Sequence, residues 1–110
     1  MNELKFKIWV EGEEGVFLGN GRVRLLEAIS KTGSITAAAK SMNMSYKKAW
    51  EQIDHMNECS DEPLVTTSSG GKGGGGTSLT AKGEQMVKQF ILVKEKFEEL
   101  AVKERSEQRF

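Results

Sequence analysis

Two interruptions in a helical pattern constrain the fold of this chain more than any other feature. Apolar residues recur at helical spacing between residues 22 and 59, but the pattern is broken at Gly33 and again at Asn43. Glycine commonly ends a helix in the left-handed conformation, and asparagine is the other residue that tolerates this conformation in a tight turn. The sequence therefore predicts three short helices, over about 22–32, 34–42 and 46–59, with a tight turn between the second and the third.

Polar residues at the start of the second and third segments support these boundaries. Ser34 or Thr36 can cap the second helix, and Ser45 is well placed to cap the third. The buried stripe predicted for the third helix comprises Tyr46, Ala49, Ile53 and Met56. Lys47, Lys48 and Trp50 lie off that stripe, and we expect them at the surface.

Two β-hairpins are predicted to flank the three helices. Residues 4–10 alternate between apolar and polar side chains, and a polar turn separates them from a second short strand at 16–18. After Pro63, strands at 64–67 and 79–80 enclose the glycine-dominated loop 68–78. Three helices followed by a strand, a loop and a strand are typical of a winged helix-turn-helix, so the predicted fold class is mainly α with small β.

The remaining residues, 81–110, predict one long amphipathic helix. Its apolar residues alternate spacings of four and three, namely Met86, Phe90, Val93, Phe97 and Leu100. At about 1.5 Å per residue this helix is too long to bury its whole stripe on so small a domain. We therefore expect a homodimer with this stripe at the interface, and we divide the chain into a winged-helix domain with the N-terminal hairpin (1–80) and a dimerisation helix (81–110).

Composition excludes several classes of protein. The single cysteine, Cys59, rules out an intramolecular disulfide and a cysteine-rich zinc site, and the single histidine, His55, is expected on the surface. Lys72 is followed by glycine where a nucleotide-binding loop needs serine or threonine. We expect no enzyme activity, no metal and no cofactor. The chain has no apolar run long enough for a membrane span, so we expect a cytoplasmic protein.

Charge patterning favours an anionic partner, although sixteen basic and sixteen acidic residues give a net charge of zero. Residues 28–50 contain four lysines and no acid. In a winged helix-turn-helix the third helix enters the DNA major groove by its N-terminal turn, where Ser45, Tyr46, Lys47 and Lys48 lie. The wing, with Lys72 among glycines, then lies along the phosphate backbone. The alternatives are a solvated helix face and a glycine loop without a ligand.

The same segments carry a family resemblance. The stretches TGSITAAA (32–39), MSYKKAW (44–50), Met56-Asn57 and GGKGGGG (70–76), with Leu79-Thr80 and Gly83, resemble the N-terminal DNA-binding domain of ModE-type molybdate-responsive regulators. That domain is itself similar to the LysR-type helix-turn-helix. The resemblance covers nearly the whole chain and departs from the family pattern at Asn43, where the family often has glycine.

The resemblance implies a homodimer whose two recognition helices and two wings bind a palindromic operator in double-stranded DNA. The residues it implies at the DNA are Ser34 and Thr36 on phosphate, Ser45, Tyr46, Lys47, Lys48 and Trp50 in or beside the major groove, and Lys72, Gly73 and Gly74 on the backbone.

Members of the family continue into C-terminal modules that bind molybdate; we expect this chain to lack them, so molybdate sensing is not carried over. Two alternatives remain. The protein is a stand-alone DNA-binding regulator of molybdenum-related or other genes, or it receives its effector signal from elsewhere. A winged-helix module that binds a protein partner without DNA is the alternative, and the zero net charge is its best support.

Overall fold

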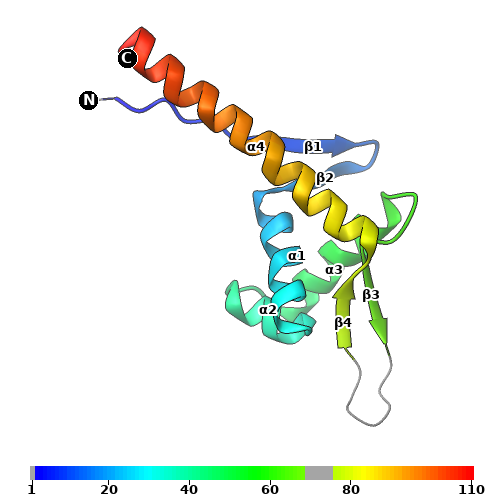
Figure 1. The fold of residues 1–110 in the computed structure, drawn as a ribbon. Coiled ribbons are helices and arrows are strands. Elements are labelled where there is room, and N and C mark those ends of the chain that lie inside the picture. The colour runs from blue at the N-terminus through cyan, green and yellow to red at the C-terminus, as the bar shows by residue number, and fades with distance from the viewer. Residues whose placement is uncertain (1, 69–75) are drawn as a thin grey trace.

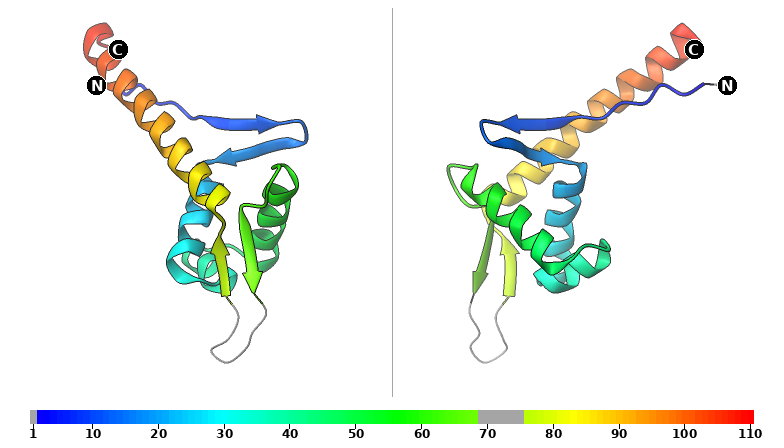
Figure 2. Two further views of the ribbon diagram at one scale, coloured as in Figure 1. Left: turned by 45° about the vertical axis from the view of Figure 1, so that its right-hand side comes forward. Right: turned by 180° about the vertical axis from the view of Figure 1, so that it is seen from behind.

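The computed structural model describes residues 2–68 and 76–110, and it confirms the mainly helical fold with two small hairpins (Figure 1). In chain order the elements are β1 (Trp9–Gly12), β2 (Gly15–Gly19), α1 (Asn20–Thr32), α2 (Ile35–Ser41), α3 (Tyr46–Glu58), β3 (Val65–Ser68), β4 (Gly76–Leu79) and α4 (Ala81–Gln108). Each hairpin forms its own two-stranded antiparallel sheet. Helices α1 to α3 form the central body, with the β3–β4 hairpin beside them as the wing (Figures 1 and 2).

Both predicted interruptions between the helices are confirmed. Helix α1 ends at Gly33, whose φ is 71°, and the turn between α2 and α3 contains Asn43 with φ 52°. The Ser34 hydroxyl accepts a hydrogen bond from the Ala37 amide at 3.1 Å, and Ser45 accepts one from Lys48 at 3.1 Å. The two serines therefore cap α2 and α3, and the alternative cap at Thr36 is not used.

The core lies where the three helices meet the wing and the start of α4. Its most completely buried large side chains are Leu25, Leu26, Ile29, Met56 and Leu64. The predicted stripe on α3 is confirmed at Ala49, Ile53 and Met56 but wrong at Tyr46, which is 53% exposed. Tyr46 is the first residue of α3 and faces a surface groove beside the wing instead of the core.

The N-terminal strand is shorter than its sequence pattern predicts. Pairing of β1 with β2 begins at Trp9 opposite Gly19, where β2 ends and α1 starts, so residues 4–8 have no strand to pair with. This N-terminal arm instead runs beside α4 (Figure 1). The Phe6 and Phe97 ring centroids are 6.2 Å apart, and Arg105 donates a hydrogen bond to the Leu4 carbonyl at 3.2 Å.

A half-buried polar cluster joins the β1–β2 hairpin to the helical body. The Arg22 guanidinium, at the start of α1, donates hydrogen bonds to the Val16 carbonyl at 2.6 Å and to His55 Nδ1 at 2.8 Å. Because Nδ1 accepts, Nε2 carries the hydrogen and donates to the Glu14 carbonyl at 3.2 Å. Burial lowers the pKa of Arg22. His55 is therefore not the surface histidine expected from the sequence, since it connects α3 to the hairpin.

Only the first part of α4 packs on the body. Its buried residues Gly83, Val87 and Phe90 all lie within the first ten positions, and Ala101 is the next buried residue along the helix. Beyond the body, α4 projects with the N-terminal arm beside it (Figure 2). Within residues 2–68 and 76–110, no helix combines the length and apolar character that crossing a membrane requires.

Candidate nucleic-acid interface

The first turn of α3 presents the side chains predicted for the major groove. Tyr46 and Trp50 are 53% and 48% exposed, and Ser45, Lys47 and Lys48 are also exposed. Lys47 lies 3.9 Å from Glu51 one turn later, but both side chains are largely in solvent. An exposed pair of this kind is weak, so the ammonium group can turn to an anion at small cost. The positive end of the helix dipole adds to this charge.

Small residues set the position of α3 against α2. Ala38 and Ala49 are fully buried and Ala39 is 2% exposed, so the two helices approach closely. The turn between them is closed by backbone hydrogen bonds, including one from the Met44 amide to the Ala39 carbonyl at 3.0 Å. The orientation of α3 is therefore fixed by buried contacts, and its first turn remains exposed.

The wing is attached to the helical body at two points. The Thr77 amide of β4 donates to the Gly33 carbonyl at 2.9 Å, which joins the wing to the turn between α1 and α2. At the other strand, Asn57 Oδ1 accepts from the Leu64 amide at 2.8 Å and the Val65 amide at 3.2 Å, while its Nδ2 donates to the Val65 carbonyl at 3.1 Å. Sequence reasoning assigned Asn57 no role, because a polar residue near the end of a helix does not reveal which backbone it faces.

A groove of about 260 Å³ lies between these elements. Its walls come from the α1–α2 turn, the start of α2, the first residue of α3 and the end of β3 with the start of β4, and comprise Gly33, Ser34, Ile35, Thr36, Tyr46, Thr67, Ser68, Gly76 and Thr77. Six of these side chains carry a hydroxyl group, namely Ser34, Thr36, Tyr46, Thr67, Ser68 and Thr77. Hydroxyl groups are common donors to phosphate oxygens. The groove brings the predicted residues Ser34, Thr36 and Tyr46 together. It also adds Thr67 and Ser68, which sequence reasoning missed.

The other predicted DNA residues are placed differently. Lys47, Lys48 and Trp50 do not line the groove but are exposed on the adjoining part of α3. Lys72, Gly73 and Gly74 lie outside the described residues.

Charge is distributed unevenly between the two ends of the molecule. The lysines of residues 28–50, namely Lys31, Lys40, Lys47 and Lys48, are all exposed. Three glutamates, Glu11, Glu13 and Glu14, belong to the β1–β2 hairpin, and strands β3 and β4 extend away from this hairpin (Figure 1). Two of these lysines, Lys47 and Lys48, directly follow Tyr46, which lines the groove, so exposed positive charge adjoins it despite the net charge of zero. In the part of the chain that the structure describes, no three acidic, histidine or cysteine side chains gather as metal ligands would.

The five residues predicted at the dimer interface fall into two groups. Phe90 is only 5% exposed and Met86 packs partly buried against the core, so both contribute to the fold of the single chain. Val93, Phe97 and Leu100 are 45%, 44% and 51% exposed. The apolar stripe of α4 thus continues from the domain core onto the surface.

Comparisons with known proteins agree with this architecture. The family model for bacterial regulatory helix-turn-helix proteins of the lysR family matches residues 21–84. The molybdenum transport protein ModE of Azotobacter vinelandii is 49% identical over 78 residues, which are 71% of this chain and 29% of that protein. The transcriptional regulator ModE of Haemophilus influenzae is 38% identical over 93 residues, or 84% and 36% of the two chains.

A third relative is the molybdenum-pterin-binding protein MopB of Rhodobacter capsulatus, which is 48% identical over 73 residues, or 66% of this chain and 27% of that protein. The chain therefore spans between 27% and 36% of the length of these relatives.

Proposed function

Because this chain belongs to the lysR family of bacterial regulatory helix-turn-helix proteins, we propose that it is a transcriptional regulator that binds a palindromic operator as a homodimer. The observation that carries the proposal is the hydroxyl-lined groove between the α1–α2 turn, α3 and the wing. An exposed helix start with two lysines adjoins it. This arrangement suits a DNA backbone beside a major groove.

In the proposed complex, the first turn of α3 enters the major groove. Base edges, or the phosphates beside them, are contacted by Tyr46, Lys47 and Lys48. Trp50 packs against the wall of the DNA major groove. Ser34 and Thr36 donate to phosphate oxygens from the other side of the 260 Å³ groove. Lys72, Gly73 and Gly74 contact the backbone from the wing.

The homodimer is formed through the exposed part of the α4 stripe, Val93, Phe97 and Leu100. Two copies related by a twofold axis present two recognition helices, which is why the operator is palindromic. The half-sites are then about 10 bp apart, or a multiple of that distance.

The relatives also suggest which genes are regulated. Curated relatives are named as a molybdenum transport protein and as ModE transcriptional regulators. We propose that the operators of this protein control genes of molybdenum transport or metabolism.

The first test is enrichment of genomic DNA. Purified protein is incubated with sheared DNA of its source organism at near-physiological salt, and the retained fragments are sequenced. We expect a few palindromic sites, with genes of molybdenum transport or cofactor synthesis next to them. A folded protein that retains no fragment above background contradicts the proposal and favours the protein-interaction module instead.

The second test measures the contribution of the helix start. Lys47→Ala and Lys48→Ala should each weaken operator binding by about tenfold or more, and a lost phosphate contact should reduce the slope of log K against log salt by about 0.9. Lys103→Ala is the matched control, because Lys103 is an exposed lysine on α4, away from the groove. Unchanged affinity and salt slope in both α3 variants would remove α3 from the DNA interface.

A further inference from the structure

The exposed apolar side chains are concentrated at one end of the molecule. Of the twelve large hydrophobic residues exposed in the described part of the chain, two are Tyr46 and Trp50 of the recognition helix. The other ten lie on the N-terminal arm, the β1–β2 hairpin, α4 and the residue after it, namely Phe6, Trp9, Val10, Val16, Leu92, Val93, Phe97, Leu100, Val102 and Phe110. Monomeric proteins rarely expose large apolar patches that have no partner.

Part of this surface is hollowed into a groove of about 360 Å³ between the hairpin and α4. One wall belongs to residues 8–10 and to Phe17 and Leu18 of β2. The other wall belongs to α4 and comprises Met86, Gln89, Phe90, Val93 and Phe97. Gln89 is the only polar residue that lines it, so water in the groove finds few hydrogen-bond partners.

Trp9 stands at the edge of this groove with its polar atom already used. Its indole N–H donates to the Glu11 carboxylate at 3.2 Å, while the side chain remains 53% exposed. Leu18 and Phe90, which also line the groove, are 2% and 5% exposed. The groove therefore has a buried base, and beside it stands an exposed tryptophan, a residue type that is enriched among the anchor residues of protein interfaces.

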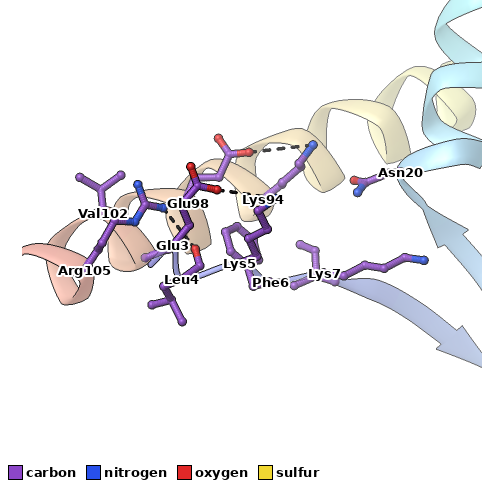
Figure 3. Close-up of a pocket in the computed structure, with 12 residues that line it drawn as sticks. Glu3, Leu4, Lys5, Phe6, Lys7, Asn20, Lys94, Glu98, Val102 and Arg105 are labelled. Carbon is purple, nitrogen blue, oxygen red and sulfur yellow. Dashed lines mark hydrogen bonds and ion pairs between the residues drawn. The ribbon is translucent and has the colours of Figure 1, made fainter. Parts of the chain in front are cut away.

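A larger hollow beside α4 has a different character (Figure 3). Its volume is about 530 Å³, and it lies between the N-terminal arm and the projecting half of α4. Charged side chains line it, among them Lys94 and Glu98, whose charged groups are 3.9 Å apart, and Arg105, which donates to the Leu4 carbonyl. Of these two hollows, the groove on the hairpin side is therefore the more apolar one, and water hydrates it less favourably.

We propose that the β1–β2 hairpin forms half of the homodimer interface, and that α4 of a second copy of this chain fills the apolar groove with Trp9 as its central contact. The inference rests on the proposed homodimer. To the α4 contact it adds the β1–β2 hairpin as a second part of the interface and Trp9 as a specific contact residue. Val93 and Phe97 belong both to the proposed α4 stripe and to the groove wall. A helix that covers these two residues from the hairpin side must therefore contact Trp9.

The geometry favours a second copy as the occupant. A twofold dimer pairs the same surface of both chains, so an apolar groove next to an apolar projecting helix is complementary to itself. The exposed residues Leu92 and Leu100 supply large side chains for it on the same helix. This interface also lies at the end opposite the wing, so pairing there leaves the α3 helices and wings of both copies accessible (Figure 2).

The test compares the only two tryptophans of the chain. Trp9 and Trp50 have nearly equal exposure, 53% and 48%, but lie on different elements, β1 and α3. The dimer dissociation constant of the full chain is measured by sedimentation equilibrium for Trp9→Ala and Trp50→Ala. We expect Trp9→Ala to raise it by about tenfold or more and Trp50→Ala to leave it unchanged. Circular dichroism checks that both variants are folded.

A second measurement avoids any loss of folding at the hairpin. In a Trp50→Phe protein, Trp9 is the only tryptophan, and its emission should shift to shorter wavelength as the concentration rises through the dimer dissociation constant. An emission spectrum that does not change across a transition seen by sedimentation overturns the inference.

Leu100→Glu separates this inference from the homodimer itself. Leu100 is exposed on α4 and does not line the groove, and a glutamate there should abolish dimerisation. If Leu100→Glu is monomeric while Trp9→Ala dimerises like the wild type, the hairpin is outside the interface and only the α4 contact stands. A wild-type protein that stays monomeric at every concentration overturns both, and the DNA-binding tests of the lysine variants remain independent of that result.

Discussion

At Gly83 the first turn of α4 passes directly over Leu64, the residue before β3. A Cβ atom added there would overlap the carbonyl oxygen of Leu64 and lie 3.0 Å from its carbonyl carbon. Thr80 fixes this close approach: its amide donates to the Leu64 carbonyl at 2.9 Å, and its hydroxyl donates to the Pro63 carbonyl at 2.7 Å. We predict that Gly83→Ala destabilises the protein by about 2 kcal/mol or more, as measured by urea unfolding.

Gly21→Ala is the matched control for this prediction. Gly21 lies in α1, and nothing is within 4 Å of the position that its Cβ would occupy. Alanine there should stabilise the protein by about 0.5–1 kcal/mol, because it reduces the freedom of the unfolded chain. Equal stabilities of the two variants would show that α4 can move away from Leu64 at no cost.

Asp61 gives the stability of the protein a component that depends on pH. The Lys82 ammonium, 3.4 Å from the Asp61 carboxylate, holds the pKa of that carboxyl below its ordinary value of 3.8. A depressed native pKa stabilises the fold above the unfolded pKa, and this contribution is lost as the pH falls through the native pKa.

Asp61→Asn should therefore be less stable than the wild type at neutral pH, with a difference that shrinks below about pH 4. Urea unfolding at a series of pH values measures it, and added salt should reduce the difference because the carboxylate is exposed. A difference that stays constant down to about pH 2 would rule out the ion pair as its cause.

At the scale of elements, Asn57 holds the recognition helix to the wing. Its side chain satisfies two backbone amides and one carbonyl at the start of β3. Asn57→Ala leaves these groups without their partners, and we predict a loss of about 2–3 kcal/mol in urea unfolding. Asn57→Asp keeps the acceptor for Leu64 and Val65 and should lose less. Equal losses in the two variants would show that the acceptor contributes nothing.

Sequence reasoning succeeded for elements whose signals are local. Gly33 and Asn43 identify their turns because few residues adopt a positive φ, and Ser34 and Ser45 identify helix starts through their own capping bonds. It was wrong where a segment far away in the sequence determines whether a residue is paired or buried. Residues 4–8 alternate like a strand, but β2 ends at Gly19 and leaves them no partner. Tyr46 fits the apolar stripe of α3, but the wing forms a groove at that position.

For the whole molecule, the pattern on α4 could not separate burial within one chain from burial between two chains. Phe90 and Val93 belong to one stripe, yet Phe90 is 5% exposed and Val93 is 45% exposed. The difference depends on where α4 leaves the helical body, which no local pattern encodes. The same limit applies to the groove, because Thr67 and Ser68 gain their place only when the wing packs beside the α1–α2 turn.

The proposed homodimer predicts that thermal stability depends on concentration. If unfolding separates two chains, mass action raises the midpoint temperature by a few degrees for each tenfold increase in protein concentration. Leu100→Glu should remove this dependence. Differential scanning calorimetry over a hundredfold concentration range measures both proteins, and a wild-type midpoint that does not move would contradict a dimer coupled to folding.

The contact between the N-terminal arm and α4 has a practical consequence for reporter fusions. Arg105 holds the Leu4 carbonyl, so the two ends of the chain lie side by side at the end of the molecule farthest from the wing (Figure 1). A fluorescent protein, an affinity tag or a surface-immobilisation handle attached at either terminus therefore starts from the same place. Energy transfer between dyes on the two termini would report on the attachment of the arm, and neither dye would stand between α3 and DNA.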